Sequence, residues 1–461
     1  MSSIRFTLAL LAGKLARAGV NLIAPERGTN LPGAVALKIC PTFLQQVRGL
    51  TARKVIAVTG TNGKSTTNNL ITHILRSSGY SVAANLEGAN MVGGVATTLL
   101  DNVSLRGTLR TDWVCLEVDE RSLPAVAQAL PIGTFTVTNV QKDQVQRNGE
   151  PDYIMGKIRK ALDPQLSASD DLTLVLNDDE PYARSLTSSG YRTVFYAVAP
   201  NRRSRSSEGP WAVTMGCPSC GEGRIRFQTL NASNIGPFRC TKCDFASRSG
   251  ECVVLEDVDF DSATFTDSGS RYQMPYTQSF FTYSYSAAIA VAKHLGIESE
   301  KVKAGLASFV NVAGRTASFE YAGKTVHYLR IKQENPDTLQ SAFDAIAAAP
   351  GTGKTLVLGL CELTDFQPYY TNTFYVYDTD VNVLPNGGVD EAICFSTYVG
   401  VDTAVALEYG GFAPEQIRVL DTEDVDKVLR AMEEAKNDDI YLITWLGWYN
   451  KLKAETERRA R

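Results

Sequence analysis

The sequence predicts an α/β protein: a phosphate-binding domain built on a parallel sheet, followed by a smaller α/β domain. Between Lys54 and Asn177, short β-branched runs alternate with helical stretches, which is typical of a parallel sheet covered by helices. A second strand–helix series begins at residue 324. We therefore expect one domain over residues 1–320 and another over 321–461.

The elements follow one another in a regular order. In the first series, strands are expected at 54–59, 113–118, 134–140 and 172–177, and helices at 65–79, 121–129 and 151–162. The alanine-rich stretch 283–309 is strongly helical and is expected to close the first domain. In the second series, strands are expected at 324–331, 355–360, 391–396 and 439–445.

Composition limits the possible functions. The 461-residue chain has a net charge of −4, which argues against a protein whose main task is binding nucleic acid. Residues 5–24 form an apolar pattern broken by Lys14 and Arg17, too early for a membrane-spanning helix of ~20 apolar residues. We expect a cytoplasmic protein with an amphipathic first helix that packs on its own domain, and a weak membrane-surface role stays open.

A phosphate-binding loop follows the first β-branched strand. Residues 60–65 read Gly-Thr-Asn-Gly-Lys-Ser and precede a helix. In such a loop the backbone N–H groups of Gly60, Thr61, Asn62, Gly63 and Thr66 bind phosphate oxygens, Lys64 neutralises charge, and the Ser65 hydroxyl ligates magnesium. Val58 stands where the strict motif has glycine, but the strand–loop–helix context predicts nucleotide binding.

A second glycine-lysine-threonine run occurs at 349–360. It precedes a strand instead of following one, so no helix N-terminus faces a phosphate there. We interpret this run as a helix-to-strand loop.

Polar groups stand where the expected strands end. They are Glu117, Asn139, Asp143, Asn177 and Asp178. Ligand sites in open parallel sheets form at the carboxyl ends of strands. Together with the phosphate loop, these groups favour a site for ATP and Mg²⁺.

Four cysteines have the spacing of a zinc ribbon. Cys217 and Cys220 are followed after nineteen residues by Cys240 and Cys243. The ligand set is closed, which predicts a structural Zn²⁺ in an insertion over residues 205–255. Cys40, Cys115, Cys252, Cys361 and Cys394 are scattered and are expected to be buried structural thiols.

Several motifs resemble those of the Mur ligases, which make amide bonds by converting a carboxylate into an acyl phosphate with ATP. They are "VTGTNGKSTT" (58–67), "TNVQKDQVQRNGE" (138–150), "VLNDDEP" (175–181) and "NVAGR" (311–315). Within this family, "LPGAVALKI" (31–39), "NLEGANMVGGVATTLL" (85–100), "EVDERSLP" (117–124) and the cysteine insertion resemble the MurT-like group. The resemblance covers nearly the whole chain.

The resemblance implies a fold and a reaction. It implies a Mur-ligase-like central domain with a MurT-type C-terminal domain, acting as the ligase-like subunit of lipid II isoglutaminyl synthase. A GatD-like glutaminase would form a heterodimer with it and supply ammonia, and the α-carboxyl of D-glutamate in the lipid II stem peptide would be amidated. The chain has only three histidines, none in a recognisable nucleophile motif, so it offers no evident glutaminase of its own.

The resemblance also implies roles for individual residues. Gly60 to Thr66 would hold the triphosphate, Ser65 and Glu117 the magnesium, and Asn139 and Asp143 would lie beside them. Arg315, the last residue of the NVAGR motif, would approach the phosphates. Lys332, from a stretched Lys-Asn-Pro motif, would lie near the substrate.

Several positions depart from the family pattern. Gln144 follows Asp143 where other Mur ligases often have histidine, and Tyr283 and Ser286 stand where asparagines are expected. Asn372 occupies the place of the C-terminal aspartate thought to assist the partner's catalytic histidine. Asp365, Asp378 and Asp380 are alternative substitutes, and the sequence does not choose among them.

Three other functions stay open. A related carboxylate–amine ligase would use a different acceptor. A degenerate paralogue would keep ATP binding and act as a scaffold. A zinc-ribbon P-loop protein that binds nucleic acid is disfavoured by the negative charge.

Overall fold

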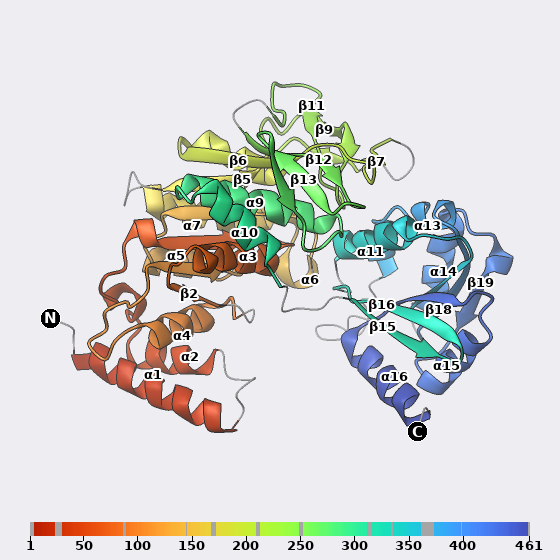
Figure 1. Cartoon of the computed structure of the whole chain (residues 1–461), viewed down its shortest axis with the longest axis horizontal. Helices are drawn as coiled ribbons and strands as arrows, with labels where there is room; N and C mark the ends of the chain where they lie inside the picture. The colour runs from red at the N-terminus through yellow and green to blue at the C-terminus, as the bar shows by residue number, and fades with distance from the viewer. Residues whose placement is uncertain are drawn as a thin grey trace.

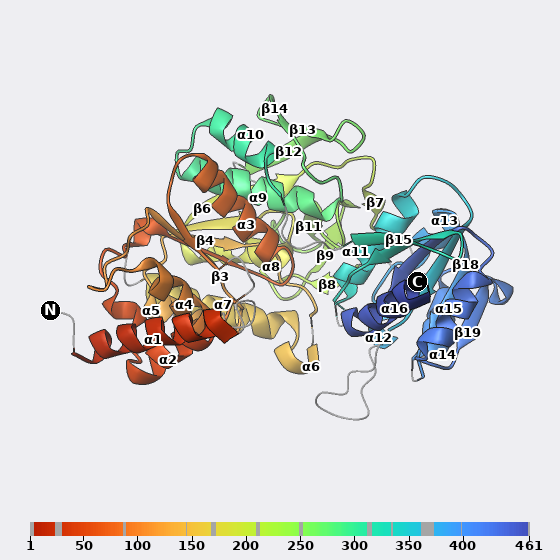
Figure 2. The same ribbon diagram turned by 60° about the horizontal axis from the view of Figure 1, so that its bottom comes forward.

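The fold is built on two large β-sheets, each covered by helices (Figure 1). The computed structural model describes residues 4–23, 30–85, 89–143, 145–166, 172–208, 213–248, 252–310, 316–332, 335–360, 373–397 and 399–459. The first sheet and its helices come from the N-terminal two thirds of the sequence, and the second sheet comes from the C-terminal third (Figure 2).

The larger sheet has nine strands in the order β14-β13-β12-β6-β5-β4-β1-β3-β2. Their bounds are β1 (Val55–Thr59), β2 (Val82–Ala84), β3 (Trp113–Glu117), β4 (Thr134–Val137), β5 (Thr173–Asn177), β6 (Arg192–Val198), β12 (Cys252–Asp259), β13 (Thr264–Asp267) and β14 (Ser270–Gln273). The strands from β2 to β12 pair in parallel, and β13 and β14 continue the sheet antiparallel. The central strands β1, β4 and β5 are buried along their whole length, as expected for strands with helices on both faces.

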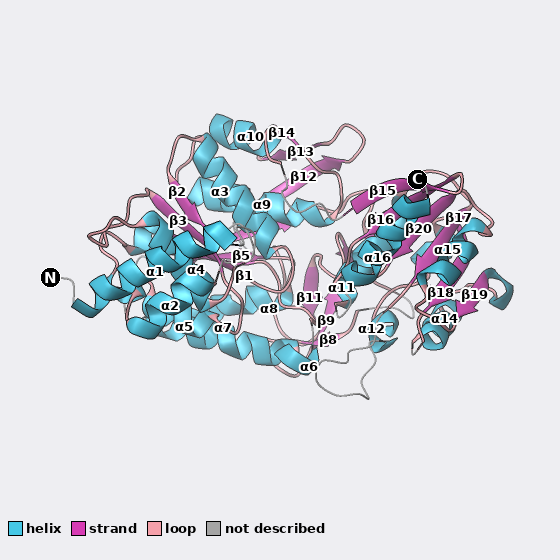
Figure 3. Cartoon of the chain, turned by 90° about the horizontal axis from the view of Figure 1, so that it is seen from below, coloured by secondary structure: helices cyan, strands magenta, loops and turns pink. Residues whose placement is uncertain are grey.

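Helices cover both faces of this sheet (Figure 3). One face carries α3 (Lys64–Ser77), α9 (Phe280–His294) and α10 (Ser299–Ala307). The other carries α4 (Val92–Asn102), α5 (Leu123–Ala129) and α7 (Pro151–Leu166), with α1 (Ile4–Ile23) and α2 (Leu31–Ile39) packed outside α4. Two short helices, α6 (Val145–Asn148) and α8 (Pro181–Arg184), follow strand ends. The expected alternation of strands and helices is thus confirmed for this part of the chain.

The cysteine-containing segment leaves the larger sheet after β6 and returns to it at β12. It forms two small sheets of its own from β7 (Arg205–Ser206), β8 (Met215–Gly216), β9 (Arg224–Phe227), β10 (Thr229–Leu230) and β11 (Phe238–Cys240). The insertion ends before its predicted bound at residue 255, because Cys252 to Leu255 already pair with β6 in the larger sheet.

The second sheet has the order β15-β16-β20-β17-β18-β19. Its strands are β15 (Thr316–Tyr321), β16 (Lys324–Leu329), β17 (Lys354–Leu358), β18 (Val389–Phe395), β19 (Ile417–Leu420) and β20 (Asp439–Ile443). β15 is antiparallel to β16, and the other pairs are parallel. The sequence did not predict β15, which already belongs to this sheet four residues before the expected boundary at 320; the division into two domains stays a prediction.

Helices again cover two faces of the second sheet. One group is α11 (Pro336–Ala348), α12 (Thr373–Tyr377), α13 (Val383–Asn386) and α14 (Gly400–Tyr409). The other group is α15 (Val425–Glu433) and α16 (Leu446–Arg459). No helix in the described ranges is both long and apolar enough to span a membrane.

The second glycine-lysine run is a connection between α11 and β17, as its order in the sequence predicted. The Lys354 ammonium is buried and donates to the backbone carbonyls of Ile346, Ala349 and Gly387. This lysine holds the ends of local elements together, so the run is not a phosphate loop.

Candidate functional site

The loop between β1 and α3 has the backbone of a phosphate-binding loop. Gly60 and Gly63 have φ values of 121° and 82°, a region that favours glycine. A Cβ atom at Gly60 would also overlap Thr138 Oγ1 and the Asn139 carbonyl. Gly63 is the residue before α3, so the free N–H groups of the first helical turn point into the loop.

The end of β4 holds this loop in place. The Asn62 N–H donates to Asn139 Oδ1 at 2.9 Å, and Asn139 Nδ2 donates back to the Asn62 carbonyl at 3.0 Å. The N–H of Thr61 donates to the Asn139 carbonyl at 2.8 Å. Asn139 therefore lies beside the loop, where it fixes the loop's backbone.

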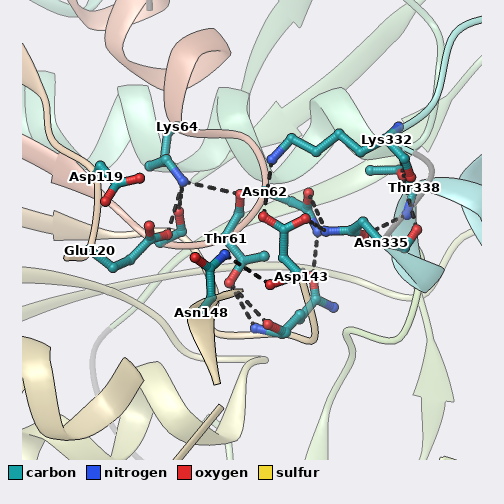
Figure 4. A network of polar contacts seen from close by, with 12 residues as sticks. Thr61, Asn62, Lys64, Asp119, Glu120, Asp143, Asn148, Lys332, Asn335 and Thr338 are labelled. Carbon is teal, nitrogen blue, oxygen red and sulfur yellow. Dashed lines mark hydrogen bonds and ion pairs between the residues drawn. The ribbon is translucent and has the colours of Figure 1, made fainter. Parts of the chain in front are cut away.

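Lys64 lies at the start of α3 and is buried. Its ammonium donates to Glu120 Oε1 at 2.9 Å and to the backbone carbonyl of Thr61 at 3.2 Å (Figure 4). Burial lowers the pKa of Lys64, but the carboxylates of Glu120, Glu117 and Asp143 together outweigh burial and raise the pKa above its ordinary value. The lysine is therefore a fixed positive charge at the mouth of the loop.

Two oxygen donors predicted to ligate magnesium flank the loop. Glu117 ends β3 and is buried, and one of its carboxylate oxygens accepts from Asn90 Nδ2 at 3.0 Å. Ser65 is half-buried in the first turn of α3. Hydroxyl and carboxylate oxygens are the ligands that Mg²⁺ prefers, so the donor chemistry fits the ion.

A polar cluster joins the loop of the larger sheet to the second sheet (Figure 4). Asn335 Nδ2 donates to Asp143 Oδ1 at 3.1 Å and to Asn62 Oδ1 at 3.2 Å. Lys332 Nζ lies 3.4 Å from the other oxygen of Asp143. The structure thus brings together Asp143 and Lys332, which are 189 residues apart in the sequence.

Asn335 is also the N-cap residue of α11. Its side-chain oxygen accepts from the Thr338 N–H at 3.0 Å, and Pro336 occupies the first helical turn. An asparagine before a proline is a strong signal for a helix start. One side chain therefore both orients the helix and contacts the phosphate loop.

A cavity of about 110 Å³ lies beside the phosphate loop. Its wall includes Gly63 and Thr66 from the loop and α3, Tyr283 from α9, and Ile235 from the cysteine insertion. Residues of the second sheet and of α11 close the other side. The pocket lies next to a helix N-terminus and between two α/β units, which is a common location for phosphate-bearing ligands.

The cysteine insertion contacts α11 directly. Asn234 Nδ2 donates to Asp337 Oδ1 at 2.8 Å, and Ser233 Oγ lies 2.5 Å from Ser341 Oγ. Burial raises the pKa of Asp337 to about 7. The insertion therefore contributes to the cavity wall and to the contact between the two α/β units.

Ion pairs strengthen this contact. Arg205 Nε lies 3.2 Å from Asp344, and Arg205 Nη1 lies 3.3 Å from Asp380. Lys142 Nζ lies 3.0 Å from Asp378. Two candidate substitutes for the C-terminal aspartate, Asp378 and Asp380, thus lie where the two α/β units meet.

The four cysteines of the insertion form one cluster. The four sulfur atoms all lie within 4.8 Å of one another, with Cys217–Cys243 at 3.9 Å and Cys220–Cys240 at 3.8 Å. Four thiolates about 2.3 Å from one zinc ion are ~3.8 Å apart, so the spacing fits a tetrahedral ion. Backbone N–H groups of Gly223 and Glu222 lower the pKa of Cys220, which favours its thiolate, whereas the Phe245 N–H at Cys243 is outweighed by burial and by the hydrogen bonds of the other three cysteines, which raise the pKa of Cys243.

Some predicted residues lie elsewhere. The Asn177 amide donates to the Thr138 carbonyl at 3.0 Å and its oxygen accepts from the Asp179 N–H, so it ties strand ends together and does not line the cavity. Arg315 and Asn372 lie outside the described residues, as does Asp365.

The two positions that depart from the family's asparagines have different surroundings. The Tyr283 hydroxyl donates to Asp179 Oδ2 at 2.9 Å while its ring lines the cavity. Ser286 donates to the Ala197 carbonyl at 2.9 Å, inside the sheet–helix contact.

Sequence reasoning missed three residues of this site. They are Glu120, Asn335 as a contact of Asp143, and Asp337. The Asn-Pro pair at 335–336 was a readable signal for a helix start beside Lys332. Glu120 had no such signal, because acidic residues are common after strands.

Comparisons with known proteins agree with this arrangement. The Mur ligase middle domain family matches residues 58–208, and the MurT ligase C-terminal family matches residues 333–446. The chain is 27% identical over 450 residues to the "Lipid II isoglutaminyl synthase (glutamine-hydrolyzing) subunit MurT" of Streptococcus pneumoniae (strain ATCC BAA-255 / R6), which covers 96% of this chain and 94% of that protein. It is 27% identical over 397 residues to the subunit of the same name from Staphylococcus aureus (strain COL), covering 85% of this chain and 84% of the relative.

Solved structures show the same fold at low sequence identity. A pseudomurein peptide ligase type C from Methanothermus fervidus superposes with a TM-score of 0.63 at 19% identity, covering 90% of this chain and 79% of that one. MurF ligase from Thermotoga maritima in complex with ADP has a TM-score of 0.57 at 16% identity, with 92% and 85% covered. The chain therefore belongs to the Mur ligase family, as a MurT-like member.

Proposed function

We propose that this chain is the ATP-dependent subunit of a lipid II isoglutaminyl synthase. A carboxylate oxygen of the D-glutamate α-carboxyl attacks the γ-phosphorus of ATP, and ADP leaves. Ammonia then attacks the carbonyl carbon of the acyl phosphate, the C–O bond to phosphate breaks, and a carboxamide and phosphate result. The two similar MurT proteins carry the name of this synthase, which supports the assignment.

The observation that carries the proposal is the meeting of two α/β units at the phosphate loop. Lys64 supplies a buried positive charge on one side, and Asp143, Lys332 and Asn335 meet on the other. A reaction that joins a nucleotide to a carboxylate needs both partners held at one place, which such a junction provides.

Residues 60 to 66 are proposed to hold the triphosphate through backbone N–H groups, with Lys64 leaving Glu120 for a phosphate oxygen. Ser65 and Glu117 are proposed to hold Mg²⁺, which would neutralise charge on the phosphates. Asn139 keeps the loop in the required conformation, and this role follows from its two bonds to Asn62.

The substrate side is proposed to use Lys332 and Asp143. Lys332 is half exposed and pairs with Asp143, so it can turn from that carboxylate to an acidic group of the acceptor. Arg315 for the phosphates and Asn372 beside the partner's site stay proposals that rest on the family resemblance. Asn177 near the nucleotide stays a proposal that rests on its place at the end of β5.

The cysteine cluster is proposed to hold structural zinc. All four ligand positions of a tetrahedral ion are taken by Cys217, Cys220, Cys240 and Cys243, leaving none for water. The small sheets around it have a core of only a few apolar side chains, so a metal ion supplies stability that the core lacks.

A glutaminase partner is proposed as the ammonia source. His73 contacts Ser308 at 3.0 Å and His327 contacts Ser318 at 3.0 Å, so neither pairs with a cysteine as a glutaminase dyad would. An exposed apolar face of α14, made of Val401, Val405 and Tyr409, adjoins the edge strand β19 and is the surface we propose for this partner.

The test is product formation by the purified chain. Wild type and Lys64→Ala are assayed with ATP, Mg²⁺ and lipid II, with ammonium alone or with glutamine and the co-expressed glutaminase. The product is identified by the mass change of a carboxyl-to-amide replacement. Wild type is expected to form amide with either nitrogen source, and Lys64→Ala with neither.

The outcomes separate the alternatives. No amide from either nitrogen source overturns the proposal. ATP hydrolysis stimulated by another carboxylate, without lipid II turnover, assigns a different acceptor. Full complementation in cells by Lys64→Ala would identify the chain as a scaffold.

A further inference from the structure

Five large apolar side chains are exposed along α1. Ile4, Leu8, Leu11, Leu15 and Leu22, here called the α1 stripe, are between 45% and 86% exposed. No other described helix exposes as many large apolar side chains. The helix lies at the periphery of the larger unit, outside α2 and α4 (Figures 1 and 2).

The α1 stripe is a continuous face. At 100° per residue, its five positions fall within an arc of about 60° and extend over ~27 Å of helix. Phe6, Ala9 and Leu10, which are buried against the rest of the protein, lie on the opposite side of the helix. The helix is therefore apolar on two faces, and the body of the protein covers only one of them.

Basic residues predominate in the N-terminal segment that contains this helix. The first 54 residues contain eight lysines and arginines and one glutamate, a net charge of +7, whereas the whole chain carries −4. Arg5 and Lys14 flank the stripe and donate to the backbone carbonyls of Ile39 and Leu100, and Arg17 pairs with Asp101, the one carboxylate of the described chain that acts on these cations. The remaining 407 residues are acidic on balance.

We propose that the α1 stripe docks on the surface of an anionic phospholipid bilayer. A helix that combines an apolar face with flanking cations lies in the plane of the interface, with its side chains among the acyl chains and its cations at the headgroups. This inference rests on the proposed function, because docking on a membrane would bring the site to a lipid-linked acceptor.

The alternative to membrane docking is that the α1 stripe packs against the α1 stripe of a second copy of the chain. The stripe has the 4-3 spacing of a heptad pattern, but it covers fewer than the three to four heptads that a stable coiled coil needs. Pairing two copies would also bring together two helices whose charged residues, Arg5, Lys14 and Arg17, are all basic. Charge thus favours an anionic surface over self-association.

Vesicle flotation tests the proposal with the full chain, without ATP, acceptor or glutaminase. Vesicles of phosphatidylglycerol and phosphatidylcholine are compared with vesicles of phosphatidylcholine alone. We expect wild type to float with the anionic vesicles, less at high salt, and Leu8→Gln/Leu15→Gln to bind about tenfold more weakly. Val401→Gln/Val405→Gln on α14 is the matched control and is expected to bind like wild type.

Two further measurements keep the result interpretable. Circular dichroism and ATP binding check that each variant is folded, and light scattering reports the oligomeric state. Failure of wild type to bind anionic vesicles, or equal binding by Leu8→Gln/Leu15→Gln, overturns the proposal. A wild-type dimer that this variant converts to a monomer assigns the stripe to a second copy instead. Because no acceptor is present, a negative result here leaves the amidation assay to decide the proposed function separately.

Discussion

Asn335 Nδ2 lies 3.1 Å from Asp143 Oδ1, and this hydrogen bond joins the N-terminus of α11 to the loop that follows β4. The same asparagine caps α11 through Thr338. One side chain thus sets the direction of a helix in the second unit and its position against the phosphate loop in the first.

Replacing Asn335 separates these two roles. Asn335→Asp keeps the cap but places a carboxylate against Asp143, whereas Asn335→Ala loses both, with a capping cost of about 1 kcal/mol. If positioning matters, both variants lower kcat/KM for amidation by about tenfold, equal to about 1.4 kcal/mol of transition-state stabilisation. Steady-state kinetics and thermal unfolding check this. An Asn335→Asp enzyme with wild-type activity would leave Asn335 as a helix cap alone.

Lys64 and Glu120 should affect ATP affinity in opposite directions. Lys64→Ala removes the charge that we assign to the phosphates, and we expect ATP affinity to fall about 100-fold, or ~2.7 kcal/mol. Glu120→Gln removes the carboxylate that holds Lys64 in the absence of nucleotide, so ATP should bind at least as tightly as to wild type. Isothermal titration calorimetry with a non-hydrolysable analogue measures both. Equal losses in the two variants would contradict this and make Glu120 a ligand of the nucleotide or its metal ion.

Zinc content and stability should fall together. Cys217→Ser removes one of the four sulfur ligands, so we expect less than the wild-type content of about one zinc per chain, with a lower unfolding temperature. Loss of ATP binding should follow only as the insertion loosens, because Ile235 lines the cavity. Elemental analysis and thermal melts check this, and Cys252→Ser, outside the cluster, is the control. A stable, zinc-loaded and inactive Cys217→Ser protein would overturn the structural assignment.

The buried Asp337 should make stability depend on pH. Burial raises its pKa from 3.8 to about 7. Between these values the folded state retains a proton that the unfolded state releases, so this group's contribution to stability falls as pH rises toward about 7 and is constant above it. Asp337→Asn removes the titration and can still accept from Asn234.

The variant should therefore gain stability relative to wild type between about pH 5 and about pH 8, by more than ~1 kcal/mol. Thermal unfolding midpoints at the two pH values measure the difference. Glu415→Gln, which removes a carboxylate on the surface, should show no such change. A difference between Asp337→Asn and wild type that is independent of pH would contradict the raised pKa.

Much of the fold could be predicted from the sequence because it depends on local patterns of residues. The apolar runs at 55–58 and 174–176 are rich in valine, isoleucine and leucine, and such runs form buried strands in most contexts. The antiparallel strand β15 was missed because its alternating pattern resembles a polar linker, and its pairing with β16 is a contact that the sequence does not display.

Some features of the candidate site could likewise be predicted from the sequence, and others could not. The sequence by itself determined the phosphate loop and the cysteine cluster, because glycine conformations and ligand spacing are local properties of a few neighbouring residues. Only the tertiary structure decided that Lys64 pairs with Glu120, that Asn335 contacts Asp143, and that the cysteine insertion forms part of the cavity wall. These contacts join residues that are 56 and 192 positions apart or belong to different sheets, so they depend on how the chain packs and no local pattern encodes them.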